Sequence, residues 1–150
     1  MADRHLSAIF EVKYMIMLSV DYGDRRTGIA VCDKNQILAT PVCVINEWNA
    51  DSLADKIIAL AEEKRAEKIV IGLPKNMDGS KGFRADACEE LGNIIKSKCS
   101  IPVVFWDERL TTVSAHKILS DNNVRGKKRK AVVDALSAEI ILQNYIDSIK

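Results

Sequence analysis

The chain has 150 residues, of which 47% are hydrophobic, and its 22 basic and 21 acidic residues leave a formal net charge of +1. This length fits one globular domain with a sizeable core, so no second domain is required. The near-zero net charge argues neither for nor against an anionic partner, so any affinity for nucleic acid must come from a local basic patch.

The sequence predicts a cytoplasmic protein with no membrane partner. No stretch approaches the roughly 18 to 20 apolar residues of a membrane span, and the N-terminus has no signal-type apolar region with a cleavage site. The cysteines form no C-x-x-C pair, which favours free thiols in a reducing compartment. They are Cys32, Cys43, Cys88 and Cys99.

Residues 1–14 show no clear periodicity, and we interpret them as an N-terminal appendage to a domain at 15–150. The domain is predicted to open with three strands, at 16–20, Thr27–Cys32 and 37–45. Because the connections between them are short and rich in turn residues, these strands are expected to form an antiparallel meander.

After this meander the apolar period changes to that of alternating helices and strands. A helix is predicted from Asp51, with Asp51 or Ser52 as its cap. The further predicted elements are a strand at Lys68–Leu73, a helix at Phe83–Lys98, a strand at 101–106, and helices at 111–119 and 131–149. This order predicts an α/β fold with a mixed five-stranded sheet and helices on both faces.

Acidic residues occur in three apolar settings. Asp21 ends the first strand, Asp107 and Glu108 follow the strand at 101–106, and Asp134 lies in the closing helix on a face of small and apolar residues. A carboxylate is costly to bury unless it is paired, hydrogen-bonded or bound to a cation. The pattern therefore predicts a site for a divalent metal ion.

Each of these acids also has an alternative interpretation without a metal. Asp21 could cap its own turn, and Asp134 could pair with Lys130 on the surface. Of Asp107 and Glu108, one could cap the following helix while the other pairs with Arg109. Strand alternation places Asp107 and Glu108 on opposite faces, but a strand buried on both sides leaves the functional acid undecided.

A basic run lies in the stretch at 121–130, which we expect to be a loop. It supplies Arg125, Lys127, Lys128, Arg129 and Lys130. Such a run is usually a solvated surface, but beside an acidic site it favours contact with a phosphate backbone, because a nuclease must hold a polyanion over carboxylates that repel it. Other basic residues expected near this rim are Arg25, Arg26, Lys75, Lys81, Arg84 and Arg109.

Four motifs, taken together and in order, resemble the YqgF (RuvX) family of pre-16S rRNA nucleases, also described as Holliday junction resolvase-like, with a ribonuclease H-like fold. The resemblance runs from about residue 15 to residue 150. The motifs are Asp21-Tyr22-Gly23 through Gly28-Ile29-Ala30, Gly72-Leu73-Pro74 with Asp78-Gly79-Ser80, Asp107-Glu108-Arg109-Leu110-Thr111-Thr112, and the closing helix with Asp134.

The resemblance implies a catalytic site that binds Mg²⁺ or Mn²⁺ and hydrolyses phosphodiester bonds. At the positions of the family's metal ligands, this chain has Asp21, Glu108 and Asp134, with Asp107 as the competing choice for the middle acid. Related resolvases carry a further acid where this chain has Ala131, which leaves three core carboxylates and the number of ions, one or two, open.

The implied substrate is the 5′ end of precursor 16S rRNA, acted on by a monomer or weak homodimer. One alternative is four-way DNA, which requires a dimer with paired sites. Another is a non-catalytic module that binds nucleic acid or ribosomal components. An actin-like ATPase is set aside, because that fold needs two such domains.

Overall fold

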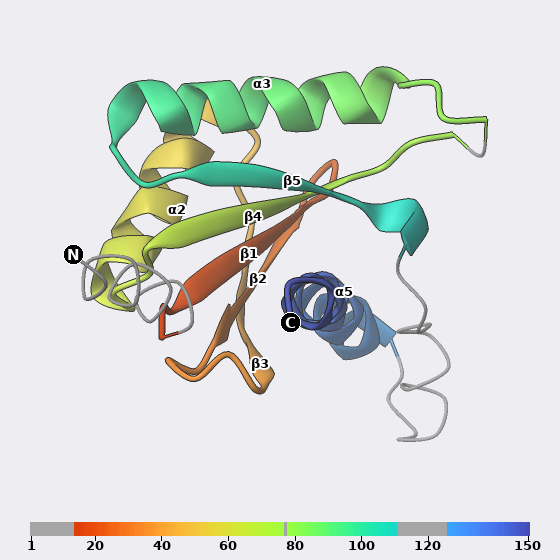
Figure 1. Ribbon diagram of the computed structural model, residues 1–150. Coiled ribbons are helices and arrows are strands. Elements are labelled where there is room, and N and C mark those ends of the chain that lie inside the picture. Colours follow the sequence, from red (N-terminus) through yellow and green to blue (C-terminus); the bar gives the residue numbers. More distant parts are fainter. Residues whose placement is uncertain (1–13, 77, 111–125) are drawn as a thin grey trace.

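The structure, a computed structural model, describes residues 14–76, 78–110 and 126–150, and the side chains of residues 126–134 are outside this description. Five strands form one sheet in the order β3-β2-β1-β4-β5 (Figure 1). The strands are β1 (Met17–Tyr22), β2 (Thr27–Cys32), β3 (Ala39–Ile45), β4 (Lys68–Leu73) and β5 (Val103–Asp107). The helices are α2 (Ala50–Glu63), α3 (Phe83–Lys98), α5 (Gly126–Ser148) and the short 3₁₀ helix η1 (Glu108–Leu110).

The sheet is mixed, as predicted. β1, β2 and β3 pair antiparallel, whereas β4 pairs parallel with both β1 and β5. The carboxyl ends of β1, β4 and β5 therefore meet at one edge of the sheet. This is the edge at which ligands bind in open α/β sheets.

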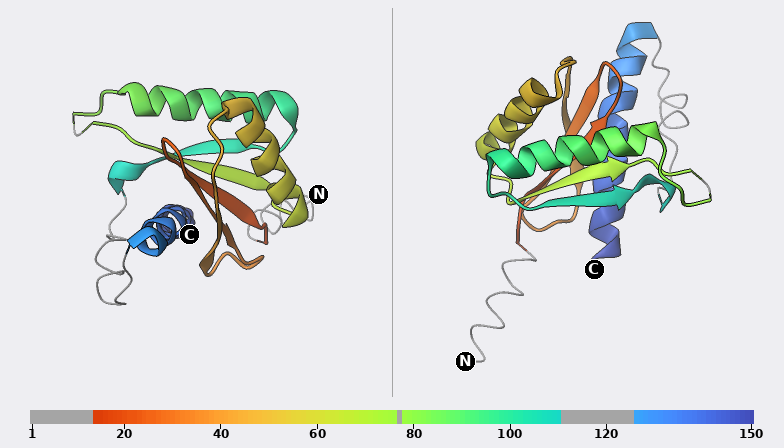
Figure 2. Two further views of the ribbon diagram at one scale, coloured as in Figure 1. Left: turned by 180° about the vertical axis from the view of Figure 1, so that it is seen from behind. Right: turned by 90° about the horizontal axis from the view of Figure 1, so that it is seen from above.

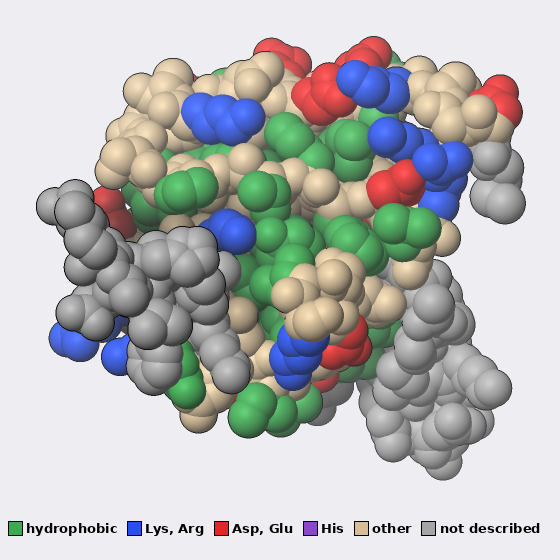
Figure 3. Space-filling view, viewed as in Figure 1, with side chains coloured by type: hydrophobic (Ala, Val, Ile, Leu, Met, Phe, Trp, Pro, Cys, Tyr) green, Lys and Arg blue, Asp and Glu red, His purple; other side chains and the backbone are tan. Residues whose placement is uncertain are grey.

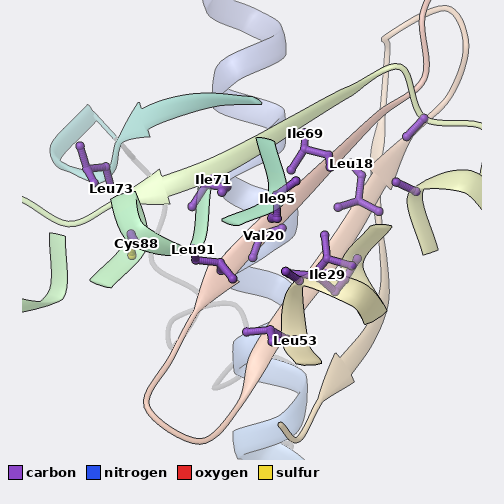
Figure 4. Packing of buried hydrophobic residues seen from close by; sticks show 14 of the residues in the cluster. Leu18, Val20, Ile29, Leu53, Ile69, Ile71, Leu73, Cys88, Leu91 and Ile95 are labelled. Atoms are coloured by element: carbon purple, nitrogen blue, oxygen red, sulfur yellow. The ribbon is translucent and has the colours of Figure 1, made fainter. Parts of the chain in front are cut away.

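Helices cover both faces of the sheet, which confirms the predicted layers. α2 and α3 lie on one face and α5 lies on the other (Figures 1 and 2). On β1, Leu18 and Val20 point into the core under α2 and α3, together with Leu53 of α2 and Leu91 of α3 (Figure 4). This packing follows from the period of two along a strand and the apolar stripe of each helix.

The α5 face has its own apolar contacts, made by the alternate residues of the same strands. Met17 and Val70 pack with Ala138 and Ile141 of α5, and all four are almost completely buried. The Ser19 hydroxyl donates a 2.7 Å hydrogen bond to the carbonyl of Ala138. α5 is thereby held against β1, on the face to which Asp21 belongs by alternation.

The third strand begins at Ala39, so the prediction of a strand from residue 37 is wrong at its start. The carboxylate of Asp33 accepts hydrogen bonds from the backbone N–H groups of Asn35, Ile37 and Leu38, at 3.0, 2.9 and 2.8 Å. These donors are used inside the turn, so they are not available for the sheet. Short Asp side chains often compete with the sheet in this way.

Two helix starts also differ from the predictions. α2 begins at Ala50 and is capped by Asn49, whose side chain accepts from the N–H of Ser52 at 3.0 Å; Asp51 and Ser52 are inside the helix. α5 begins at Gly126, so the basic residues at 127–130 belong to a helix and not to a loop. Lys and Arg are good helix formers, which explains the longer helix.

Both ends of β1 and of β5 are shifted from the predicted 16–20 and 101–106 by two residues or fewer. β1 runs from Met17 to Tyr22 and β5 from Val103 to Asp107. Pro102, just before β5, has no N–H for the ladder. The predicted helix at 111–119 and the residues of the N-terminal appendage up to 13 lie outside the described residues. Within the described part of the chain, no helix combines the length and apolarity needed to cross a membrane.

Candidate functional site

Asp21 and Glu108 meet at the edge where β1 and β5 end. Asp21 lies near the end of β1, and Glu108 directly follows β5 as the first residue of η1. Their side chains share a hydrogen bond. Two carboxylates this close repel each other unless a proton or a cation lies between them.

The carboxyl group of Glu108 lies over β4. A Cβ atom built on Gly72 would lie 3.0 Å from Oε1 of Glu108 and 2.7 Å from Cδ1 of Ile141 in α5. Burial raises the pKa of Glu108; the positive charge of Arg84 and the hydrogen bond with Asp21 act in the opposite direction. Glu108 therefore occupies a desolvated position between the sheet and α5.

Asp107 has different surroundings from its neighbour. Both of its oxygens accept hydrogen bonds from Arg109, whose Nε lies 3.1 Å from each and whose terminal Nη2 lies 2.6 Å from Oδ2. This pairing with Arg109 holds the pKa of Asp107 below its usual value, and nearby Lys75 adds to the effect. The structure thus brings Glu108, and not Asp107, against Asp21.

Asp134 lies in α5, but its side chain is outside the description. Ala138 and Ile141, which share its predicted helix face, are buried against the sheet. Among the described residues, no group of three or more His, Cys, Asp or Glu side chains is placed to hold a metal ion. The described part of the site therefore consists of the Asp21–Glu108 pair.

Arg84 of α3 connects the acid pair to the β1–β2 turn. Its guanidinium donates to the carboxylate of Asp24 and to the carbonyl of Tyr22, and it stacks over the Tyr22 ring at 5.7 Å. The same positive charge lowers the pKa of Glu108. Arg84 is thus held in place close to both acids.

The predicted basic residues of the β4–α3 loop lie on the same side of the molecule, where Figure 3 shows Lys and Arg side chains gathered near the start of α3 and the end of β5. Lys75 and Lys81 form an isolated backbone bridge, and Lys81 pairs with Glu89 at 2.7 Å. Arg109 approaches this loop at Gly79, where an added Cβ would lie 3.6 Å from its Nη1.

Arg25 and Arg26 lie in the β1–β2 turn. Arg25 stacks over the ring of Trp48, 5.2 Å from its centroid, and Nη1 of Arg26 is buried with no hydrogen-bond partner among the described residues. The predicted contacts at Lys127, Lys128, Arg129 and Lys130 fall in the first turns of α5, where side chains are not described. Arg125 lies outside the described residues.

Sequence reasoning included Gly72 only as part of a family motif, without a structural role, and assigned no role to Trp48. A glycine inside a strand often marks a close approach by another group, and this signal could have identified Gly72. Trp48 stands in a polar connection, and a single aromatic residue there is not by itself a signal of a contact surface. The packing of Arg25 on Trp48 has no signal in the sequence.

Known proteins similar to this chain agree with the geometry. A family model described as "RuvX: Holliday junction resolvase" matches residues 15–148. A Halothermothrix orenii protein named "Putative pre-16S rRNA nuclease" is 40% identical over 133 residues, covering 89% of this chain and 95% of that protein. A Lactococcus lactis subsp. cremoris protein of the same name is 41% identical over 134 residues, covering 88% and 94%.

A solved structure supports the fold. Thermus thermophilus RuvC in complex with a Holliday junction substrate superposes with a TM-score of 0.60 at 10% identity, covering 91% of this chain and 97% of that chain. This similarity confirms the predicted ribonuclease H-like fold. The chain therefore belongs to the RuvX family, which is described as Holliday junction resolvase, as the resemblance of its motifs predicted.

Proposed function

We propose that this protein is a metal-dependent nuclease that processes the 5′ end of precursor 16S rRNA in the cytoplasm. The observation that carries the proposal is the hydrogen-bonded pair of Asp21 and Glu108 at the carboxyl edge of the sheet. The substrate is suggested by the names of relatives that are 40% and 41% identical over nearly their full length.

The acid pair is suited to a hard divalent cation. A cation between the two groups would offset their repulsion, and carboxylate oxygens are the ligands that Mg²⁺ and Mn²⁺ prefer. Asp21 and Glu108 would hold the ion, with Asp134 approaching from α5 as the third ligand. Such an ion supplies a lowered pKa for the attacking water and charge neutralisation at the reacting phosphate.

The basic residues around the acids have a separate task, which is to hold the substrate. Two carboxylates repel a phosphate backbone, so cations must offset that repulsion. Arg84 is fixed beside the pair by Asp24 and Tyr22. Lys75 and Arg109 flank the exposed side of Asp107. They would bind phosphates on either side of the bond that is cut, together with the basic first turns of α5.

A cleavage assay with matched variants tests this proposal. Wild type, Asp21→Asn, Glu108→Gln and Asp107→Asn are incubated with Mg²⁺ or Mn²⁺ and two substrates, a precursor 16S 5′ fragment and a four-way DNA junction. Cutting of the RNA that is lost in Asp21→Asn and Glu108→Gln supports the proposal. If wild type cuts neither substrate above the background of Asp21→Asn, the chain is a binding module.

A second candidate function is the resolution of four-way DNA junctions. It is favoured by the family description and by the fold shared with the RuvC–junction complex. Symmetric cutting of two strands needs two sites related by a dimer axis, whereas we propose a monomer or weak homodimer. Metal-dependent cutting of the junction, with dimers seen by sedimentation, would select this function instead.

A further inference from the structure

Trp48 is an exposed tryptophan in the connection between β3 and α2. Its exposed fraction is 71%, far above that of the other tryptophan, Trp106, which is half-buried beside Tyr145. Single exposed apolar residues are common on protein surfaces. The exposure of Trp48 therefore gains significance only from how the residue is held and what surrounds it.

The backbone at Trp48 is held by an acidic side chain. Oε1 of Glu47 accepts hydrogen bonds from the N–H groups of Trp48 and Asn49, both at 3.2 Å. Oε2 of Glu47 pairs with Lys56 of α2 at 3.0 Å, and Asn49 caps that helix. The indole is thus presented from an ordered segment, which lowers the entropy lost when a ligand binds.

The position of Trp48 relates it to the acid pair. Ile45 pairs with Thr27 in the sheet, so the residues after β3 lie beside the β1–β2 turn. That turn follows Asp21 directly and lies between the start of α2 and the first turns of α5 (Figure 2, right). At about 3.3 Å per residue, the turn extends roughly 10–15 Å beyond Asp21, a span that a few nucleotides can bridge.

The acidic side chains near Trp48 are paired with cations. Glu47 pairs with Lys56, Asp24 with Arg84, and Asp51 with Lys98, which also pairs with Asp55. Arg25 is exposed and stacks on the Trp48 ring, 5.2 Å from its centroid. A guanidinium that stacks through its face keeps its N–H donors, which lie in its own plane, available for a phosphate.

From these contacts we infer that Trp48 and Arg25 form a binding site for an unpaired nucleotide of the substrate. The base stacks on the open side of the indole, and Arg25 contacts the adjoining phosphate. Stacking on an exposed aromatic ring needs a base whose face is uncovered, so single-stranded nucleic acid fits and continuous duplex does not. This inference rests on the proposed function, because it assigns a single-stranded flank to the same substrate.

Binding assays with two RNA ligands test the site. Fluorescence anisotropy in EDTA compares a labelled RNA hairpin that has a single-stranded extension with the same hairpin made blunt. The variants are Trp48→Ala, Trp48→Leu, Trp48→Phe and Arg25→Ala. The matched control is Leu38→Ala, which removes a side chain that is 62% exposed in the β2–β3 turn, at the opposite end of the sheet. Thermal melting verifies that each variant folds.

We expect wild type to bind the extended RNA more tightly than the blunt hairpin. Trp48→Ala and Trp48→Leu should weaken binding of the extended RNA about tenfold, equal to about 1.4 kcal/mol, and Trp48→Phe less than about threefold. The logarithm of the association constant falls with the logarithm of the salt concentration. Arg25→Ala should make this slope shallower by about 0.7, whereas Trp48→Ala should leave it unchanged. Leu38→Ala and all blunt-hairpin affinities should match wild type.

Three results would overturn the inference: equal affinity of wild type for both ligands, unchanged binding by Trp48→Ala and Trp48→Leu, or equal losses on the blunt hairpin. Because EDTA prevents cutting, these measurements do not depend on catalysis. The site can therefore fail while Asp21-dependent cleavage stands, and cleavage can fail while the site binds RNA.

Discussion

Gly72 leaves the space in which the carboxyl group of Glu108 lies, since a Cβ at this position would come within 3.0 Å of Oε1. Gly72 belongs to β4, and Glu108 follows β5, the strand next to it. The lack of a side chain on one strand thus sets the position of an acid on its neighbour. The consequence can be tested at the glycine without changing the acid.

We expect Gly72→Ala to lower the rate of nuclease cleavage clearly, while it lowers the free energy of unfolding only a little. The added methyl group must displace both the end of Ile141, which is flexible, and the Glu108 carboxylate, so the cost in unfolding free energy should be about 1 kcal/mol. Cleavage rates and urea unfolding measure the two effects. The control is Gly92→Ala in α3, where a Cβ would meet Phe105 at 2.5 Å on the opposite face. If both variants keep full activity, Gly72 has no role in placing Glu108.

The adjacent acids Asp107 and Glu108 should respond differently to neutralisation. Glu108→Gln should abolish metal-dependent cleavage, because the amide is a poor replacement for a ligand carboxylate. Asp107→Asn should reduce the rate by no more than about fivefold, because an exposed ion pair such as that with Arg109 contributes at most about 1 kcal/mol. Single-turnover rates at several Mn²⁺ concentrations distinguish them. A larger loss of rate in Asp107→Asn than in Glu108→Gln would make Asp107 the ligand.

Asp33 should contribute stability that depends on pH. Burial would raise the pKa of Asp33, but the backbone donors of Leu38, Ile37 and Asn35 outweigh it and lower the pKa below the unfolded value of about 3.9. The contribution is therefore present above pH 4 and is lost as the pH falls through the folded-state pKa. Asp33→Asn should cost about 1 kcal/mol or less at pH 7, because the group is exposed.

Urea unfolding of wild type and Asp33→Asn at pH 7 and at pH 3 measures this difference. The gap between the two proteins should narrow at the lower pH. A gap that stays constant over this range would mean that the carboxylate charge of Asp33 does not stabilise the turn.

The four cysteines should fall into two classes of reactivity. Burial raises the pKa of Cys88 to about 12, so only about one thiol in ten thousand is ionised at pH 8, and burial also raises the pKa of Cys32. Cys43 and Cys99 are half-buried, so reagents reach them more easily, although burial also raises the pKa of Cys43. Alkylation at pH 8, followed by peptide mass spectrometry, should label Cys43 and Cys99 first. Early labelling of Cys88 would contradict its buried position.

Much of the fold was predictable because the period of apolar residues differs between helices and strands. The predicted bounds of β2, β4 and α3 agree with the structure at both ends. Two of the errors occurred where a polar side chain competed with the backbone pattern, as Asp33 does before β3 and Asn49 does before α2. Such local hydrogen bonds do not alter the apolar period, so periodicity could not detect them.

The sequence by itself determined that acids follow apolar strands, and therefore that Asp21 and one acid of the 107–108 pair lie at the sheet edge. Only the tertiary structure shows that Glu108, and not Asp107, lies against Asp21, because β5 is covered on both faces and its alternation favours neither side. The choice depends on the space above Gly72 and on the pairing of Asp107 with Arg109. Both are contacts between neighbours in space, which the order of residues along one strand does not specify.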